Sequence, residues 1–299
     1  MFKKISIFGV GLIGGSFALA LKRAGAVNEV VGVGRRMETL ERARQLGIID
    51  HACSSVEDAV SGADLILVAA PVAQTETILA SIAPHLRPGT VVTDAGSTKS
   101  DVVEAARMAL GPKIAQFVPG HPIAGREQNG PDAAIVDLYA GKKAVLTPLP
   151  ENSAEDVEKV ASAWKHCGAI IHRLSAEEHD KVFAAVSHLP HLLAYALVDD
   201  IAHKPHAGLL FQYAASGFRD FTRIAGSSPE MWRDITLANQ PALLSELDSY
   251  LEQLASLRAL LAERNGSAIE AIYANAQRAR HQWITTIEAA EKQNTQGGD

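Results

Sequence analysis

Cysteine is scarce in this chain of 299 residues. Its two cysteines, Cys53 and Cys167, show neither a CxxC spacing nor a nearby cluster of histidine and cysteine. These facts argue against a disulfide framework and against a structural zinc site. We expect two buried thiols in a protein of the reducing cytoplasm, and no metal centre.

Positive charge is also in short supply. Lysine and arginine number 28 against 34 aspartates and glutamates, so the formal net charge is −6, and no block of basic residues occurs. This balance argues against an extended surface for nucleic acid or an anionic membrane, although a local basic pocket could bind a small anion. Beyond the N-terminal segment, no stretch approaches the roughly 18 apolar residues of a membrane helix. The expected partners are small molecules or a second copy of the chain.

The N-terminal segment "SIFGVGLIGGSFALALKRAG" follows two lysines and contains an Ala-Leu-Ala triplet, so it superficially resembles a secretory signal. Its surroundings predict otherwise. The apolar pattern indicates a strand over residues 4–10, a helix over residues 12–24 and a second strand over residues 29–34. Together these segments make a βαβ unit, which a signal peptide does not form.

The glycines of this unit fit a phosphate-binding turn. Gly9 permits the tight turn, Gly11 lets the backbone approach a pyrophosphate, and Gly14 lets the helix lie close to the strand. The helix N-terminus, with Leu12 and Ile13, then faces the anion. Within a βαβ unit, this GxGxxG pattern predicts a dinucleotide site.

The strand pattern recurs downstream and predicts an α/β fold with a doubly wound parallel sheet of the Rossmann type. Further strands are expected at residues 63–70, 90–94, 115–119, 143–147 and 169–173, with a helix at residues 154–166. Ligands of such sheets bind beyond the carboxyl ends of the strands. The turns that contain Ala70, Pro71 and Ser97 are therefore expected on the cofactor side.

After Leu174 the pattern is nearly all helical, with leucines between residues 244 and 261 on one helical face. We expect a dinucleotide-binding domain over residues 1–174 and an all-α domain for substrate binding and dimerisation over residues 175–299. The apolar faces are interpreted as core packing. A long apolar face can also pack against a second chain, so a homodimer is expected.

The end of the second strand bears on cofactor choice. An NAD site usually places Asp or Glu there, about 20 residues past the glycines, to bind the ribose hydroxyls. Here Gly34 stands at that place, followed by Arg35 and Arg36, whose guanidinium groups could bind a 2′-phosphate. NADP is favoured and NAD is possible. The alternative is that both arginines belong to a solvated turn.

Two stretches contain residues suited to chemistry. His121 follows Gly120 in an expected loop at the ligand end of the sheet, where it could take the proton of an alcohol during hydride transfer. In "VSHLPHLLAYAL", His188 and His191 are three residues apart and would share a helical face. With no matching carboxylate or cysteine motif, binding of an anionic substrate is favoured over a metal. Arg223, which lies among aromatic residues, could hold a carboxylate.

The motifs "GVGLIGGS", "DAGSTKS", "GHPIAGRE", "SHLPH" and "GFRDFTRIAGSSPEMWRDI" occur in this order. Together they resemble those of the prephenate/arogenate dehydrogenase family of tyrosine biosynthesis over about residues 4–260. The resemblance implies a Rossmann domain, a helical dimerisation domain and an active site in the cleft between them. It also implies oxidative decarboxylation of a cyclohexadienol to a phenol, which would give 4-hydroxyphenylpyruvate or tyrosine, CO2 and reduced cofactor.

The resemblance also implies roles for individual residues. His121 would be the catalytic base, and Ser97 would hydrogen-bond the substrate hydroxyl and orient His121. Arg223 would hold a substrate carboxylate. The remaining family positions around the substrate are His188, His191, Glu127 and Gly217. Arg126 stands where several relatives carry a small side chain. This departure leaves undecided what binds the side chain of the substrate, and hence which substrate is chosen.

Three questions stay open at this point. The choice between prephenate and arogenate depends on one ammonium group, which a single residue could recognise. No regulatory domain is seen after the helices, so inhibition by tyrosine would act at the active site. A β-hydroxyacid dehydrogenase is an alternative, with Lys181 or Lys204 as its lysine, but it leaves "GHPIAGRE" unexplained. A non-catalytic NADP-binding sensor is a second alternative, and it needs neither His121 nor Ser97.

Overall fold

The computed structural model describes residues 1–126 and 128–296. The chain divides into two compact units, Met1–Leu243 and Leu244–Asp299. The first unit contains the sheets and the helices that follow them, and the second contains most of two long helices. The domain boundary expected near Leu174 remains a prediction.

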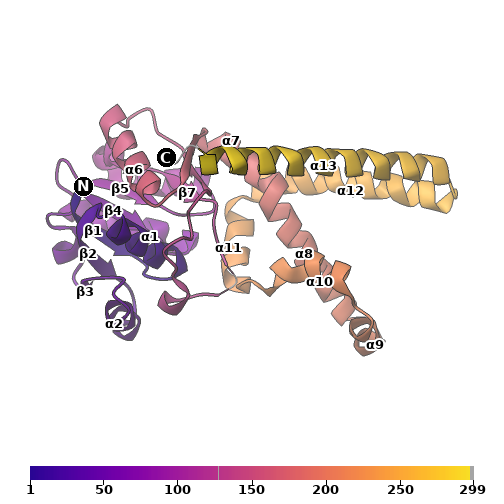
Figure 1. Ribbon diagram of the computed structural model, residues 1–299, viewed down its shortest axis with the longest axis horizontal. Coiled ribbons are helices and arrows are strands. Elements are labelled where there is room, and N and C mark those ends of the chain that lie inside the picture. Colours follow the sequence, from indigo (N-terminus) through magenta and orange to yellow (C-terminus); the bar gives the residue numbers. More distant parts are fainter. Residues whose placement is uncertain (127, 297–299) are drawn as a thin grey trace. The chain divides into compact units, whose positions relative to one another are not determined.

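A six-stranded parallel sheet forms the centre of the first unit (Figure 1), in the order β3-β2-β1-β4-β5-β6. The strands are β1 (Phe2–Phe8), β2 (Val27–Val33), β3 (His51–Cys53), β4 (Leu65–Val68), β5 (Val91–Asp94) and β6 (Phe117–Val118). This topology confirms the predicted doubly wound sheet, but the strands expected at residues 143–147 and 169–173 belong to a second sheet instead. The sequence pattern missed β3, which is only three residues long.

Alternate residues along the strands point to opposite faces, and each face has its own apolar core. Ile5, Ile7 and Leu67 join one cluster, and Ile66 and Val68 join the other. The helices that precede β9 in this unit are α1 (Leu12–Arg23), α2 (Met37–Gln45), α3 (Val56–Val60), α4 (Thr75–Ile82), α5 (Ser100–Leu110) and α6 (Ala154–His166). Both faces of the central strands are covered, which explains their continuous apolar sequence.

A second, three-stranded sheet contains β7 (Gly120–Pro122), β8 (Lys143–Leu146) and β9 (Ile170–Arg173). β7 runs antiparallel to β8, and β9 runs parallel to it. His121 lies in β7 opposite Val145. The expectation that His121 lies in a loop is therefore wrong, because three residues bounded by glycine and proline are too few for a periodic signal.

The chain after β9 is helical, as predicted. The helices are α7 (Ala176–Phe183), α8 (Leu189–Ala202), α9 (Ala207–Gln212), α10 (Ser216–Thr222), α11 (Pro229–Ala238), α12 (Gln240–Ala262) and α13 (Gly266–Gln296). A capping box between Ser175 and Glu178 begins α7. A π-helical turn, Ala184–His188, joins α7 to α8. Pro190 has no N–H for the carbonyl of Val186 inside that turn, which favours the local widening.

The continuous stretch Ala176–Ala202 is long and apolar enough to cross a membrane by length and composition alone. This contradicts the expectation that no second stretch would approach this criterion. The same stretch contains His179 and Asp180, which are hydrogen-bonded to residues at the sheet. These bonds attach the beginning of the stretch to the sheet, although only 28% of its apolar window is buried.

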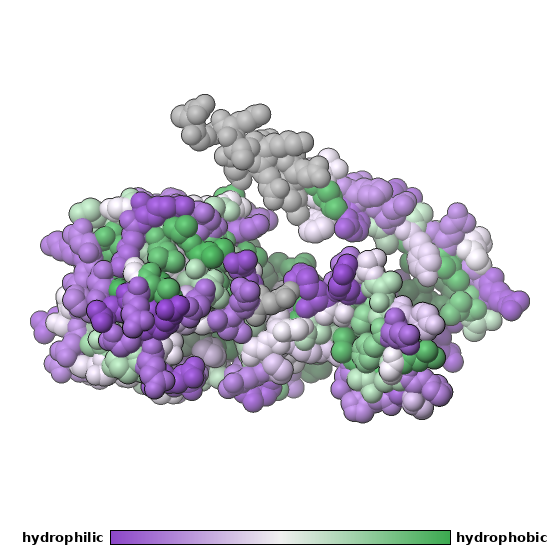
Figure 2. Space-filling model, turned by 60° about the horizontal axis from the view of Figure 1, so that its bottom comes forward, coloured by the Kyte–Doolittle hydropathy of each residue, from purple (hydrophilic) through white to green (hydrophobic). Residues whose placement is uncertain are grey.

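Large apolar side chains remain at the surface of the second unit. They include Leu244, Leu251, Leu254, Leu261, Tyr273 and Trp283. Figure 2 shows hydrophobic residues at the surface of the visible face, interspersed with hydrophilic ones. The predicted leucine face of α12 is thus exposed in the single chain.

We expect Gly14→Ala to lower the free energy of unfolding by about 1–3 kcal/mol. The added Cβ would lie 2.2 Å from the carbonyl oxygen of Gly9 and 2.8 Å from Cγ2 of Ile7. Urea unfolding of the free protein measures the change. Gly11→Ala is the matched control, because no described atom lies within 4 Å of its added Cβ. Equal losses of stability in both variants would contradict this view of the turn.

Candidate active site

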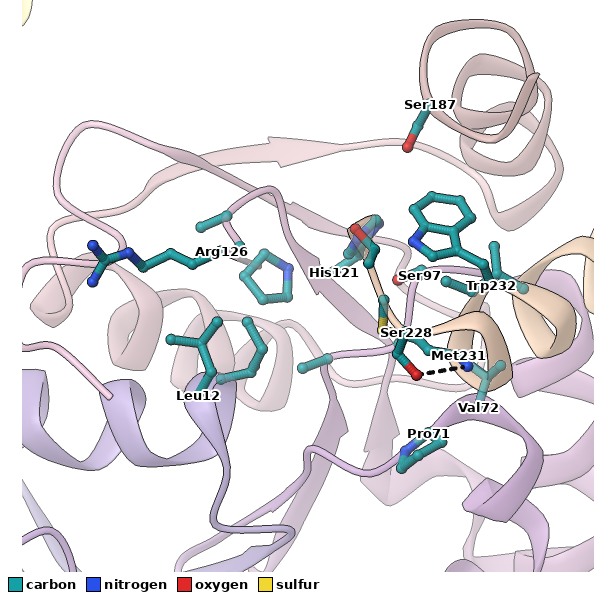
Figure 3. Close-up of a pocket in the computed structure, with 18 of the residues that line it drawn as sticks. Leu12, Pro71, Val72, Ser97, His121, Arg126, Ser187, Ser228, Met231 and Trp232 are labelled. Atoms are coloured by element: carbon teal, nitrogen blue, oxygen red, sulfur yellow. Dashed lines mark hydrogen bonds between the residues drawn. The ribbon is translucent and has the colours of Figure 1, made fainter. Parts of the chain in front are cut away.

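A pocket of about 710 Å³ opens within the first unit. One side is formed by residues 11–13, 69–72 and 95–97, which follow the carboxyl ends of β1, β4 and β5. The segment from His121 to Arg126 forms another side, and residues of the π-turn, α8 and α11 close the pocket. Figure 3 shows Leu12, Pro71 and His121 around this space. The pocket therefore lies at the ligand end of the parallel sheet.

The turn after β1 fits a dinucleotide phosphate. Gly9 has a φ of +99°, and a Cβ there would lie 2.5 Å from the carbonyl oxygen of Ala69. In the part of the chain that the structure describes, no side chain caps α1 at Gly11, and its first turn holds no acidic residue. Its first N–H groups are thus available to an anion.

The residues predicted to bind the cofactor fall into three groups. Gly11, Leu12, Ile13, Ala70 and Pro71 line the pocket. Gly9 and Gly14 shape the turn beneath it. Gly34, Arg35 and Arg36 lie exposed between β2 and α2, and none of them is among the described residues that line the pocket.

Asp94, at the end of β5, forms a buried ion pair with Lys99. Its Oδ2 accepts hydrogen bonds from the Lys99 ammonium and from Gly96 N at 2.8 Å. Its Oδ1 accepts from Gly120 N at 2.9 Å. One carboxylate thus holds both the loop that contains Ser97 and the first residue of β7.

His121 lines the pocket, and its ring contacts α7. Its Nδ1 lies 2.8 Å from Nε2 of His179, and Nδ1 of His179 lies 2.9 Å from Oδ1 of Asp180. Burial lowers the pKa of His121 well below its ordinary value, with smaller contributions from His179 and Lys99. The ring is therefore neutral at physiological pH, as a base requires.

Ser97 also lines the pocket, near His121 and Trp232 (Figure 3). The hydrogen bond that the structure shows on the His121 ring goes to His179, however, and not to the Ser97 side chain. No local sequence pattern marks His179 and Asp180 as part of the site. Their adjacency was visible, but 58 residues separate His179 from His121, and local spacing does not reveal that contact.

His188 and His191 have different surroundings. His191 lines the pocket, stacks on Trp232 at a centroid distance of 3.5 Å and places Nδ1 2.9 Å from the Ser187 carbonyl oxygen. His188 is buried, and it is not among the described pocket residues. Asn239 Nδ2 lies 3.0 Å from its Nδ1, and a further hydrogen bond joins it to the Ser97 main chain. The structure therefore does not bring His188 to the pocket.

Cationic groups lie along the open side of the pocket. Arg223 begins the short helix after α10, lines the pocket and lies near enough to His191 to lower its pKa further, although burial lowers it most. Arg126 also lines the pocket (Figure 3). Gly217 lies exposed in α10 and away from the described lining. Glu127 lies outside the described residues.

A parallel sheet with a phosphate-binding turn, a partly buried neutral histidine and nearby cationic side chains define a dinucleotide-dependent dehydrogenase. Comparisons with known proteins specify the family. Residues 17–173 match the model of the prephenate dehydrogenase nucleotide-binding domain, and residues 175–274 match that of its dimerization domain. The chain belongs to the prephenate dehydrogenase family.

Individual relatives agree with this assignment. The cyclohexadienyl dehydrogenase of Zymomonas mobilis is 38% identical over 94% of this chain and 96% of its own length. The structure of Aquifex aeolicus prephenate dehydrogenase with hydroxyphenyl propionate and NAD+ is 36% identical, with a TM-score of 0.87 over 95% of this chain and 99% of that one. The Synechocystis arogenate dehydrogenase structure is 30% identical, with a TM-score of 0.80 over 94% and 99%.

This chain is therefore an NAD(P)-dependent dehydrogenase, and both alternatives from the sequence are set aside. The non-catalytic sensor does not account for membership of an enzyme family across both domains. A β-hydroxyacid dehydrogenase would need a lysine in the pocket. Lys181 and Lys204 are exposed, and neither is among the described lining residues.

The surroundings of His188 predict a pH dependence of stability. Burial lowers its pKa to about 4, from 6.5 in the unfolded chain. The unfolded chain then binds the proton more tightly than the folded one. The free energy of unfolding is therefore not reduced by this residue above about pH 6.5, and it decreases as the pH falls toward 4. We expect wild type to lose up to about 3 kcal/mol more than His188→Gln over that range.

Urea unfolding of both proteins at the two ends of this pH range measures the difference. His203→Gln is the control, because His203 is exposed and its pKa is raised by a hydrogen bond to the Asp199 main chain. Parallel pH profiles for wild type and His188→Gln would show that His188 is not held neutral by the fold.

Proposed function

We propose that this chain catalyses the oxidative decarboxylation of prephenate, arogenate or both, with hydride transfer to NAD(P). The observation that carries this proposal is that His121, a partly buried neutral base, lines the same pocket as the dinucleotide turn and the two cationic side chains. The relatives act on prephenate, cyclohexadienyl substrates or arogenate, as their names state. The products would be 4-hydroxyphenylpyruvate or tyrosine, CO2 and reduced cofactor.

The turn after β1 and the start of α1 would hold the cofactor phosphates. Gly9 and Gly11 allow the backbone to approach them, and the uncapped helix N-terminus favours their negative charge. Ala70 and Pro71, beyond β4, would border the nicotinamide end. The bound nicotinamide supplies the hydride acceptor of the reaction.

His121 accepts the proton of the ring hydroxyl, at the carbon from which the hydride departs. Ser97, which lines the same pocket, hydrogen-bonds that hydroxyl. Release of CO2 is driven by formation of the aromatic ring. The protein therefore has to position the reactants and stabilise charge, and these side chains suffice for both tasks.

Arg223 binds one substrate carboxylate, and Arg126 faces the other end of the substrate. Both side chains lie at the exposed edge of the pocket, where a guanidinium keeps its charge. His191, fixed by stacking on Trp232, contacts the substrate between them. Two cations suit a substrate with two carboxylates, and tyrosine is similar enough to the product to compete for the same groups.

Three further features belong to this proposal. NADP is preferred over NAD because of Arg35 and Arg36. The exposed apolar residues of α12 and α13 pair with a second copy of the chain, as the description of the matched dimerization domain suggests. The protein works in the cytoplasm, a reducing compartment that suits a chain with two cysteines and no disulfide framework.

The test of the proposed function is an assay of the purified protein with prephenate and arogenate in turn, each with NAD and NADP. Reduced nicotinamide is followed by its absorbance. We expect His121→Asn to lower kcat by about 100- to 10,000-fold, because the general base is lost, with little change in cofactor affinity. Turnover near the wild-type value in this variant would remove His121 from the mechanism.

The carboxylate contact predicts a different kinetic signature. Arg223→Ala should mainly raise KM, by the equivalent of about 1.5–3 kcal/mol, because a charge-assisted contact at the exposed edge of the pocket is lost in both the ground and the transition state. Arg219→Ala is the matched control, since Arg219 is exposed on the neighbouring helix α10 and is not among the described lining residues. Equal effects of the two variants would contradict the assignment.

Cofactor preference is tested at the end of β2. Replacing Arg35 and Arg36 with alanine should weaken NADP binding by about 1.5–3 kcal/mol per lost charged contact, and leave NAD binding unchanged. Adding Gly34→Asp should invert the preference, since the new carboxylate binds the ribose hydroxyls. Its Cβ would lie 3.3 Å from Cδ2 of Leu40, a contact that a small side-chain shift relieves.

Titration of both cofactors by fluorescence gives the affinities. Arg44→Ala serves as control, because Arg44 is exposed on α2 and pairs with Glu41. A wild type that prefers NAD, or a double variant with unaltered NADP affinity, would contradict the proposal. Arg35 and Arg36 would then be solvated surface charges that do not bind the cofactor.

A further inference from the structure

A continuous chain of side-chain hydrogen bonds leads from the pocket into the protein interior. It runs from His121 to His179 and then to Asp180, over distances of 2.8 and 2.9 Å. His179 is fully buried and Asp180 nearly so. We propose that His179 and Asp180 are positioning residues that fix the tautomer of His121, so that its unprotonated Nε2 is presented to the substrate. This inference rests on the proposed role of His121 as the base.

The direction of the chain is set at Asp180. Its Oδ1 accepts a hydrogen bond from Lys99 N at 2.8 Å, and its Oδ2 accepts one from Ser100 N at 2.7 Å. Main-chain N–H groups can only donate, so both oxygens of Asp180 act as acceptors. Burial would raise the pKa of Asp180, but hydrogen bonds from His179 and Ser100 outweigh it and lower the pKa. Asp180 is therefore an ionised carboxylate.

The ionised Asp180 determines which nitrogen of each imidazole carries the proton. Nδ1 of His179 must donate to Oδ1 of Asp180, so Nε2 of a neutral His179 carries no proton and accepts. Nδ1 of His121 then donates to that atom. A neutral His121 has one proton only, and Nε2 is left unprotonated, which is the form that a general base requires.

The same chain accommodates the product of proton transfer. When Nε2 of His121 takes the hydroxyl proton, the new N–H bond forms there and the Nδ1 proton stays in its hydrogen bond to His179. The positive charge is then stabilised through His179 by the ionised Asp180. No proton has to pass along the chain, and no further reactant is needed.

Charged and titratable groups surround the two rings from several elements. Lys99, at the start of α5, and His188, in the π-turn, disfavour a cationic His121. Asp180 in α7 and Asp94 at the end of β5 favour a cationic His179, although its burial has the larger, opposite effect. The geometry and these charges agree on two neutral rings in the resting enzyme.

Asp180 also has a structural task, which the test has to separate from its positioning role. It binds the first N–H groups of α5, and its own carbonyl oxygen accepts from Asn239 Nδ2 at 2.8 Å. A loss of activity on its replacement could therefore follow from a displaced helix. His179 makes neither of these contacts, so its variants isolate the chain of hydrogen bonds.

The first experiment reads the tautomers directly. Ring nitrogen shifts of isotopically labelled histidine in the wild-type protein distinguish the two neutral forms, and His121→Gln and His179→Gln assign the signals. We expect the Nδ1–H form for both residues. An Nε2–H form of His121 at neutral pH would overturn the proposal. This readout needs no substrate, so its failure differs from a failure of the proposed function.

The second experiment uses the kinetics of Asp180→Asn. The amide removes the negative charge that fixes the donors along the chain, and an amide whose N–H turns toward Nδ1 of His179 reverses them and places N–H on the pocket side of His121. We expect kcat to fall by on the order of 10- to 1,000-fold with KM little changed, and the acid limb of the pH profile to move to lower pH. The ring nitrogen signals of His121 and His179 should no longer show the Nδ1–H form alone.

Glu178→Gln is the matched control, because the same carboxylate-to-amide change occurs two residues away on α7 and glutamine also completes a capping box. A pair of His179 variants decides the question even if Asp180→Asn does not fold. His179→Gln keeps an acceptor for Nδ1 of His121 and should retain more activity than His179→Leu, which removes it. Equal kcat values and unshifted acid limbs in these two variants would overturn the proposal.

Discussion

The buried ion pair between Asp94 and Lys99 is the interaction on which the site depends. Both side chains are almost fully excluded from solvent, so either charge alone would be left uncompensated at a cost of several kcal/mol. The carboxylate also accepts from the N–H groups of Gly96 and Gly120. These contacts fix the loop of Ser97 and the start of β7 to the two oxygens of one carboxylate. The positions of two segments that line the pocket therefore depend on the ion pair between Asp94 and Lys99.

From this ion pair, a network of hydrogen bonds continues into the helical part of the first unit. The main chain at Lys99 and Ser100 donates to Asp180, and Asp180 in turn meets His179 and Asn239. Each buried donor or acceptor in this set has a partner, which is the condition for polar groups in a low-dielectric interior. The network thus joins the sheet to α7 and to the end of α11.

The sequence predicted the parallel sheet because its strands are continuous apolar runs between glycine-rich turns, and it predicted the phosphate-binding turn from Gly9, Gly11 and Gly14. His121 was found from its place beyond the sheet, but its strand and its partner were not. β7 has three residues, too few for a period of two, and His179 lies 58 residues away. The three-residue spacing of His188 and His191 suggested one shared role, whereas the hydrogen bonds of Asn239 and the π-turn separate their surroundings. Such long-range contacts have no local pattern.

The electrostatic arrangement reconciles two opposing demands on the base. Burial and Lys99 keep His121 unprotonated, which makes the base available at physiological pH but weakens its affinity for a proton. Asp180 acts in the other direction, through His179, and is most effective once His121 has gained its charge. Burial and Lys99 disfavour the protonated ring, whereas Asp180 stabilises it. The two effects oppose each other, so the free-energy difference between the neutral and the protonated ring is kept smaller than burial and Lys99 alone would make it. A buried carboxylate one imidazole away from the base thereby contributes to the reaction while remaining out of contact with the substrate.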